Sequence, residues 1–274
     1  GIRHATLEAT GRWDAIEEDG RMHLLTAAGL LGRCTSLSSV LSPLPALRYR
    51  GHVTRSAGKL RMADFVSPPP ERPFETPTIL IVGSSMSAGK TTAARILIRQ
   101  LKRIGLEVVG AKLTGAGRYR DILTMRDAGA DAIFDFVDAG LPSTVCPEPE
   151  YRRVLKDLLS RLAGAEADVA VLEVGASPLE PYNGAVAVAA LEGHVRLTLL
   201  CASDPYAVLG VVEAYGLRPD LVTGIATNTR AAVELVDRLT GLPALNVRDK
   251  AALPDLMRLI ETRFGVGQEP EAID

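Results

Sequence analysis

From residue 78 onward, short apolar runs alternate with longer segments whose apolar positions follow a helical period. Short apolar runs bounded by turn residues predict buried strands, and the longer segments predict helices that pack one face on a sheet. Strands that alternate with helices form right-handed β–α–β units, so the pattern predicts an α/β fold with a mostly parallel sheet flanked by helices. The expected strands are Thr78–Gly83, Val108–Leu113, Asp168–Gly175, Val195–Ala202, Leu221–Thr227 and Ala244–Val247. The expected helices are Lys90–Ile104, Asp121–Ala128, Glu150–Leu162, Pro205–Tyr215, Arg230–Thr240 and Lys250–Phe264.

Residues 1–66 follow a different pattern. The candidate strands His4–Thr10, Met22–Thr26 and Ala46–His52 are separated by turn-forming pairs, which predicts a small strand-containing α+β or β-rich domain. Residues 67–77 hold five prolines, which exclude a helix or a central strand and are typical of a semi-rigid linker. We therefore expect an N-terminal domain over 1–66, a linker over 67–77 and a larger domain over 78–274.

Composition narrows the classes of function. Hydrophobic residues make up 47% and charged residues 23% of the chain, as in ordinary globular proteins, and the net charge is −2. This balance argues against nucleic acid or an anionic membrane as the main partner. No apolar run approaches the ~18 residues that span a bilayer. The cysteines Cys34, Cys146 and Cys201 are scattered, which favours a reducing, cytoplasmic location over a zinc site or a disulfide framework.

The strongest chemical signal follows the first strand of the larger domain. A glycine-rich turn joins that strand to a helix, and it ends in Gly-Lys-Thr-Thr. The exposed N–H groups and the dipole of a helix N-terminus bind phosphate, a lysine at this point reaches the outer phosphates, and the next hydroxyl ligates Mg. The segment therefore predicts a P-loop that binds ATP and Mg through Gly83, Ser84, Ser85, Met86, Ser87, Ala88, Gly89, Lys90, Thr91 and Thr92.

The spacing of this loop, G-x5-G-K-T, resembles that of dethiobiotin synthetase and its relatives. Lys112 in Val109–Gly115 matches the lysine at the end of that family's next strand, and Asp121 matches an aspartate that ligates Mg. Glu173 matches the glutamate that ends the Walker B strand, and Asn228 matches an asparagine that reads adenine. The resemblance covers roughly residues 78–247. It implies that Thr91, Asp121 and Glu173 hold Mg and that the enzyme is a homodimer.

A closer likeness joins the chain to a group of dethiobiotin-synthetase-like proteins, some of which are assigned as D-glutamate N-acetyltransferases. Met125–Ala130 and Asp135–Thr144 carry this likeness. The turn Gly175–Leu179, which includes Ala176, differs from the Gly-Ala-Gly-Gly turn beside the substrate of dethiobiotin synthetase. This difference weighs against the substrate of the biotin pathway.

Several of these residues also have a simpler structural interpretation. Lys112 could be a surface lysine, and Asp121 could be a helix N-cap. Ser143 and Thr144 follow Pro142 in a turn that could bind an anionic substrate or be a plain loop. Tyr182 could line the substrate pocket or be an ordinary turn residue. Glu173 interrupts an apolar strand, and a buried carboxylate is costly unless it is paired or binds a metal.

The leading hypothesis is an ATP- and Mg-dependent enzyme that transfers phosphoryl to a carboxylate or carbamate of a small anionic substrate, in the manner of a ligase or cyclase. Lys90, Lys112 and Glu173 would be the catalytic residues. Asn228 lacks a following guanine-reading aspartate, and Ser85 replaces the second lysine of positioning ATPases. Both features favour a small-molecule enzyme. The alternatives are an N-acyltransferase that acts on a small amino acid such as D-glutamate, with acetyl-CoA held by the P-loop, and a non-catalytic nucleotide sensor.

Overall fold

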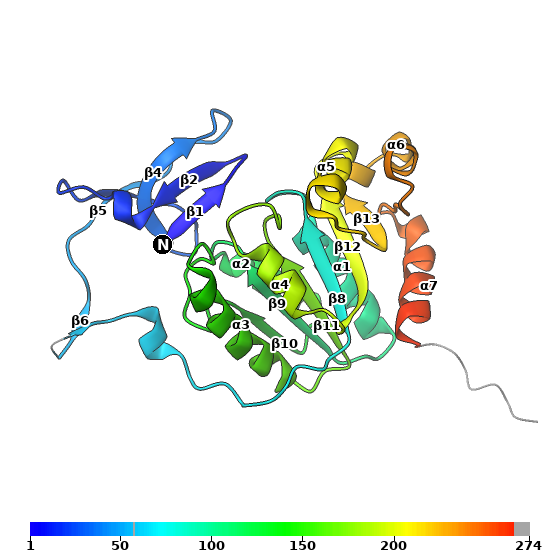
Figure 1. The fold of residues 1–274 in the computed structure, drawn as a ribbon, viewed down its shortest axis with the longest axis horizontal. Coiled ribbons are helices and arrows are strands. Elements are labelled where there is room, and N and C mark those ends of the chain that lie inside the picture. The colour runs from blue at the N-terminus through cyan, green and yellow to red at the C-terminus, as the bar shows by residue number, and fades with distance from the viewer. Residues whose placement is uncertain (57, 266–274) are drawn as a thin grey trace, which may run out of the picture.

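A computed structural model describes residues 1–56 and 58–265 of the chain, and its larger part is built around a parallel sheet. The sheet has six strands in the order β10-β9-β11-β8-β12-β13, and every neighbouring pair is parallel (Figure 1). The predicted parallel sheet is confirmed. The strands are β8 (Thr78–Gly83), β9 (Val108–Thr114), β10 (Ala132–Asp135), β11 (Val169–Val174), β12 (Val195–Ala202) and β13 (Leu221–Gly224).

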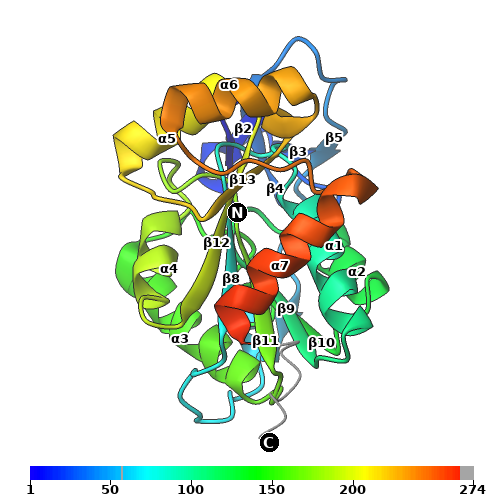
Figure 2. The same cartoon turned by 90° about the vertical axis from the view of Figure 1, so that its right-hand side faces the viewer.

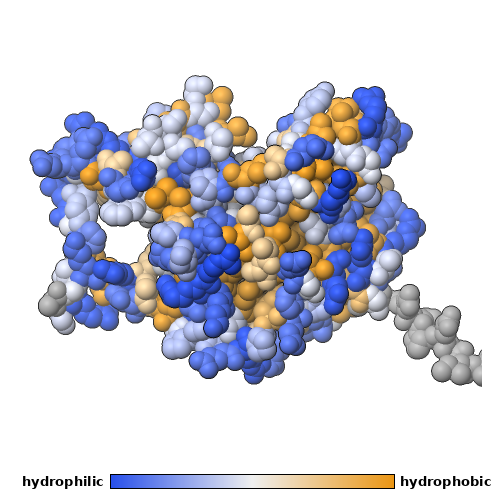
Figure 3. Space-filling model, viewed as in Figure 1, coloured by the Kyte–Doolittle hydropathy of each residue, from blue (hydrophilic) through white to orange (hydrophobic). Residues whose placement is uncertain are grey.

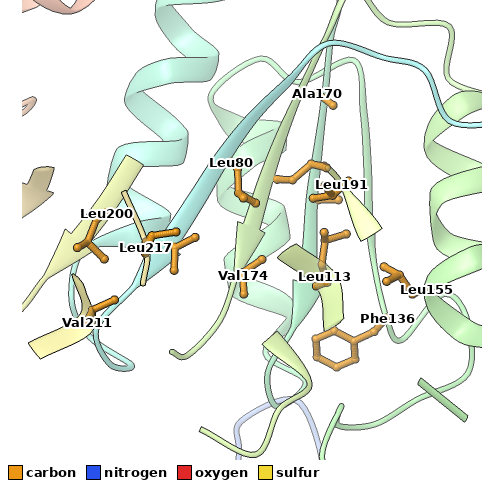
Figure 4. Packing of buried hydrophobic residues seen from close by; sticks show 14 of the residues in the cluster. Leu80, Leu113, Phe136, Leu155, Ala170, Val174, Leu191, Leu200, Val211 and Leu217 are labelled. Atoms are coloured by element: carbon orange, nitrogen blue, oxygen red, sulfur yellow. The ribbon is translucent and has the colours of Figure 1, made fainter. Parts of the chain in front are cut away.

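Helices cover both faces of this sheet, as Figure 2 shows with α1, α2 and α7 on one side and α3 and α4 on the other. Ile79 and Ile81 of β8 face Leu97 of α1, whereas Leu80 packs with the α3 side, because successive strand residues point to opposite faces. Figure 4 shows part of the apolar cluster on the α3 side of the sheet, which contains Leu80. The helices are α1 (Lys90–Arg103), α2 (Tyr119–Asp127), α3 (Glu148–Ala163), α4 (Gly184–Ala190), α5 (Pro205–Tyr215), α6 (Arg230–Thr240) and α7 (Leu253–Phe264).

In the larger unit, two expected strands differ clearly from the observed structure, and β10 (Ala132–Asp135) was not expected. The strand expected at Leu221–Thr227 ends at Gly224, whose φ of 91° turns the chain into the short 3-10 helix Ile225–Thr227. No strand forms over Ala244–Val247, where Ala244 makes one isolated bridge to Val222. The side chain of Asn246 then accepts the N–H of Arg248 in a turn, which ends the extended run.

Residues 1–48 form a five-stranded antiparallel sheet in the order β1-β2-β4-β3-β5, so the prediction of a β-rich N-terminal part is confirmed. The single strand expected over His4–Thr10 is two strands, because the chain turns where Glu8 N–H donates to Ala5 O (3.0 Å). These strands are β1 (Ile2–Ala5), β2 (Ala9–Arg12), β3 (Arg21–Leu24), β4 (Leu31–Leu37) and β5 (Ala46–Arg48), followed by a small hairpin of β6 (Thr54–Arg55) and β7 (Gly58–Lys59).

The proline-rich residues 67–77 form neither helix nor strand, as expected, but they lie on the larger unit. Phe74 is buried and meets His194 edge-on, with ring centroids 5.5 Å apart. The Arg72 N–H donates to Ser160 Oγ of α3 (3.1 Å). On the face in Figure 3, hydrophilic residues prevail over the N-terminal sheet, and apolar residues gather toward the middle of the larger unit. Among the described residues, no helix has both the length and the apolar character needed to cross a membrane.

Candidate functional site

The glycine-rich segment forms a tight loop between β8 and α1 at the central strand of the sheet. Lys90 opens α1 and folds back over the loop, so that its Nζ donates to the Ser85 carbonyl (2.6 Å). A Cβ on Gly83 would lie 2.8 Å from the backbone oxygen of Ala176, so this first loop residue has to be glycine. Burial lowers the pKa of Lys90, and the nearby Glu173 carboxylate opposes this effect. The loop therefore has the strand–turn–helix geometry of a P-loop.

With five residues between its glycines, the loop is one residue longer than the common P-loop spacing of four, and Ser84 at its start ties it to the sheet. Ser84 N–H donates to Cys201 O (2.9 Å), and Ser84 Oγ accepts the N–H of Ser203 (3.1 Å), so the loop is tied to the end of β12. The N–H groups of Ser87 and Lys90, by contrast, meet no acceptor among residues 1–56 and 58–265. Free amides at a helix N-terminus are the groups that bind phosphate oxygens.

Thr91 and Glu173 come together beside this loop. The Thr91 hydroxyl donates to Glu173 Oε2 at 3.1 Å, and Glu173 is 2% exposed at the end of β11. A hydroxyl and a carboxylate are hard oxygen donors of the kind that Mg²⁺ prefers. This donor pair fits Mg, although no group of three or more His, Cys, Asp and Glu side chains that could hold a metal occurs in the described part of the chain.

Lys112 lies next to Glu173 because β9 and β11 are neighbours and the two residues are in register. Lys112 is 4% exposed, and its Nζ donates to Asp121 of α2 in an ion pair. Lys112 is therefore not a surface lysine. Asp121 sits in the first turn of α2, but its side chain caps no N–H of that helix, and its partner is Lys112 rather than Thr91 or Glu173.

A cavity of about 370 Å³ joins these residues. The predicted residues Lys90, Thr91, Lys112, Asp121 and Glu173 all line it, as do Ala176 and Tyr182 of the expected substrate turn. The arrangement brings a lysine for phosphate, a hydroxyl–carboxylate pair for Mg and a second lysine to one space. The full lining is Met86, Ser87, Gly89, Lys90, Thr91, Thr92, Arg95, Lys112, Gly115, Ala116, Arg118, Arg120, Asp121, Thr124, Glu173, Gly175, Ala176 and Tyr182.

Three lining arginines were missed by sequence reasoning. Arg95 lies one helical turn after Thr91, and Arg118 and Arg120 flank the start of α2. None forms a salt bridge with an acid among the residues that the structure describes. With Lys90 and Lys112 they make the cavity cationic, which suits an anionic ligand. The signal available in the sequence was the Arg-x-Arg run just before Asp121.

Ser143 and Thr144 do not line this cavity. Thr144 is buried, and its hydroxyl donates to Tyr182 O (2.7 Å) and accepts the Gly115 N–H (2.9 Å). Ser143 Oγ accepts the N–H of Val145 (3.2 Å). Both hydroxyls are used inside the protein, and that of Thr144 holds the backbone of Gly115 and Tyr182, which line the cavity.

Asn228 lines a second, smaller cavity of about 190 Å³ on the other side of the phosphate loop. The two cavities share Ser87, Gly89 and Thr92. Asn246 and Arg248 also line the smaller one, and sequence reasoning missed both because Asn246 lies within a segment that was expected to be a strand and Arg248 directly follows it. A nucleotide on the phosphate loop would have space for its base here.

Asp135 ends β10 in register with Lys112, and it is 2% exposed. Its Oδ1 accepts the N–H of Val137 (2.8 Å), and Asp138 accepts the N–H of Asp135 (2.8 Å). Burial, helped by the Asp138 carboxylate, raises the pKa of Asp135 to about 6. The two carboxylates therefore stabilise the turn after β10.

No protein-family model and no curated protein sequence matches this chain. Solved structures do match its fold. HypB from Helicobacter pylori, in complex with nickel, is 17% identical over 73% of this chain and 92% of that protein, with a TM-score of 0.46. FtsY from Thermotoga maritima is 19% identical over 65% of this chain and 62% of that protein, with a TM-score of 0.42. The hydrogenase maturation factor HypB from Archaeoglobus fulgidus is 15% identical over 68% of this chain and 91% of that protein, with a TM-score of 0.41. These likenesses concern the fold alone.

Proposed function

We propose that the chain is a Mg-dependent ATP-binding enzyme that transfers the γ-phosphoryl group to a carboxylate or carbamate oxygen of a small anionic substrate. The observation that carries this proposal is the convergence of Lys90, the Thr91–Glu173 pair and Lys112 on one cationic cavity. The smaller cavity at Asn228 supports it, since it offers room for the base on the far side of the loop.

In this reaction an oxygen of the substrate attacks the γ-phosphorus, the bond to the β-phosphate oxygen breaks, and ADP leaves. Negative charge builds on the transferring group and the leaving oxygen, so catalysis comes mainly from positioned positive charge. Lys90 would neutralise the phosphates, and Lys112 would hold the attacking carboxylate. Thr91 and Glu173 would ligate Mg, which would supply further positive charge to the phosphates.

To hold the carboxylate of a substrate, Lys112 would have to leave its ion pair with Asp121 or share it. In the structure their ion pair joins the buried Lys112 to the partly exposed Asp121. An anionic substrate would give Lys112 a second partner, and Asp121 would then be free to serve Mg as a direct or water-bridged ligand, as the resemblance implies. A homodimer with the substrate near the subunit interface is part of the same proposal.

The test is to incubate the protein with Mg-ATP, acetyl-CoA and a panel of small carboxylates and amines. ADP release that depends on one carboxylate supports phosphoryl transfer. Release of free coenzyme A thiol without ADP would replace it by the N-acyltransferase alternative. Binding of ATP with neither product would favour a nucleotide sensor. Lys90→Ala serves as the inactive control in each assay.

A further inference from the structure

The first strand of the N-terminal sheet and the turn after it contact the larger unit at three alternate residues. The His4 N–H donates to Tyr182 Oη (2.7 Å), and Thr6 Oγ1 donates to Glu180 Oε1 (2.6 Å). Glu8 Oε1 accepts the hydroxyl of Ser87 (2.9 Å). Ser87 belongs to the phosphate loop, so Glu8 ties the N-terminal sheet to the loop itself.

This contact rests on a packed interface. Leu25 and Leu30 of the N-terminal unit form one buried cluster with Ala116, Ala176 and Tyr182. The last three of these residues line the main cavity. The N-terminal sheet, blue in Figure 1, is therefore docked directly on the wall of the candidate site.

Glu8 is itself held in place by Arg3. Their ion pair leaves the Arg3 side chain 8% and the Glu8 side chain 20% exposed, and Arg3 also donates to Leu25 O (2.7 Å). The Ser87 hydroxyl donates its hydrogen bond to Glu8 Oε1, whereas Arg3 binds Glu8 Oε2. Both oxygens of the carboxylate are thereby engaged, one by Arg3 and one by Ser87.

We propose that Glu8 is a positioning residue for the phosphate loop: by accepting the Ser87 hydroxyl it holds the loop in its phosphate-binding conformation before a nucleotide arrives. The inference rests on the proposed function, because it gives Glu8 a role at the same site. A loop that is ordered in advance loses less conformational entropy on binding, so the nucleotide binds more tightly. The N-terminal sheet thus completes the nucleotide site without contacting the nucleotide.

The test compares Mg-ATP affinity by calorimetry in the wild-type chain and five variants. Glu8→Ala and Ser87→Ala remove the same hydrogen bond, the second without changing any charge, and each should weaken binding on the order of tenfold. The double variant should bind no more weakly than either single variant. Glu8→Gln keeps an acceptor oxygen and should restore most of the affinity. Thr6→Val is the matched control, because it removes a contact of the same interface away from the loop, and its affinity should equal that of the wild type.

A second measurement does not depend on a nucleotide. Hydrogen exchange of the amides at residues 84–92 in the nucleotide-free protein should be faster in Glu8→Ala and Ser87→Ala than in Thr6→Val. Equal or tighter Mg-ATP binding by Glu8→Ala, or a loss shared equally by Thr6→Val, would overturn the positioning role. If the wild type binds no Mg-ATP, the proposed function fails, and unchanged exchange in Glu8→Ala would then overturn the ordering of the loop as well.

Discussion

The hydroxyl of Thr91 donates to the carboxylate of Glu173 across 82 positions of the chain, and both side chains face the cavity that contains Lys90. Thr91 lies in α1, which follows β8, and Glu173 lies near the end of β11, which is paired with β8. Two hard oxygen donors beside a buried lysine are what a Mg-nucleotide site needs.

Lys90→Ala should weaken ATP binding roughly 10- to 100-fold, because a charge-assisted contact with the outer phosphates is lost. The chain offers a matched control in its other Gly-Lys pair, since Lys59 is exposed and lies far from the phosphate loop in sequence. Lys59→Ala should bind like the wild type in calorimetric titrations. Unchanged affinity in Lys90→Ala would remove the basis for a P-loop site.

Glu173→Gln and Thr91→Val should each abolish the tightening of ATP binding by Mg, on the order of tenfold or more, because an amide or a methyl group is a poor ligand for a hard cation. Affinity is measured with Mg and with EDTA. Glu107→Gln, at an exposed glutamate, is the control. Full Mg dependence in both variants would mean that other groups hold the metal, and Asp121 would be the next to test.

Lys112→Met keeps the apolar stem and deletes the charge, so turnover should fall about 100-fold or more while nucleotide affinity changes little. The change also strands the Asp121 carboxylate, which should lower the melting temperature. Lys112→Met combined with Asp121→Asn should recover stability without recovering turnover. Normal turnover in Lys112→Met would place the acceptor substrate elsewhere.

The arginines of the cavity should bind the acceptor substrate. Arg120→Ala should raise its KM about tenfold through the loss of a charged contact. Arg126 lies on the same helix but does not line the cavity, and Arg99 stands in the same relation to Arg95. Arg126→Ala and Arg99→Ala should leave KM unchanged. Equal effects of Arg120→Ala and Arg126→Ala, or of Arg95→Ala and Arg99→Ala, would indicate general electrostatic attraction rather than a site.

Asp135 should make stability depend on pH. Its pKa is raised from 3.8 to about 6 in the folded protein, so ionisation costs stability as the pH rises through this range. Asp135→Asn keeps the oxygen that accepts the Val137 N–H and avoids that cost. The free energy of unfolding of Asp135→Asn should exceed that of the wild type, and this gain should grow from pH 4 to pH 7 by up to about 3 kcal/mol, measured by urea unfolding. A gain that does not change with pH would contradict the raised pKa.

Local patterns in the sequence determined much of the larger unit. The strands Thr78–Gly83 and Val195–Ala202 have the bounds that were expected from their mainly apolar residues, because a buried parallel strand is made mostly of apolar side chains. The phosphate loop was also evident, since its glycines and lysine are adjacent in the chain. Glu173 stood out because a carboxylate in an apolar strand needs a partner, and Thr91 supplies one.

Only the tertiary structure decided which distant residues meet. The order of the strands sets Lys112 between Glu173 and Asp135, and no spacing in the chain encodes that order. The sequence left open whether Ser143 and Thr144 bind an anion or form a plain loop, and the fold turns Thr144 toward Tyr182 and Gly115. The contact of Glu8 with Ser87 likewise depends on how the N-terminal sheet docks. A sequence pattern reports the period and chemistry of one segment, whereas a site is formed by side chains that long-range packing brings together.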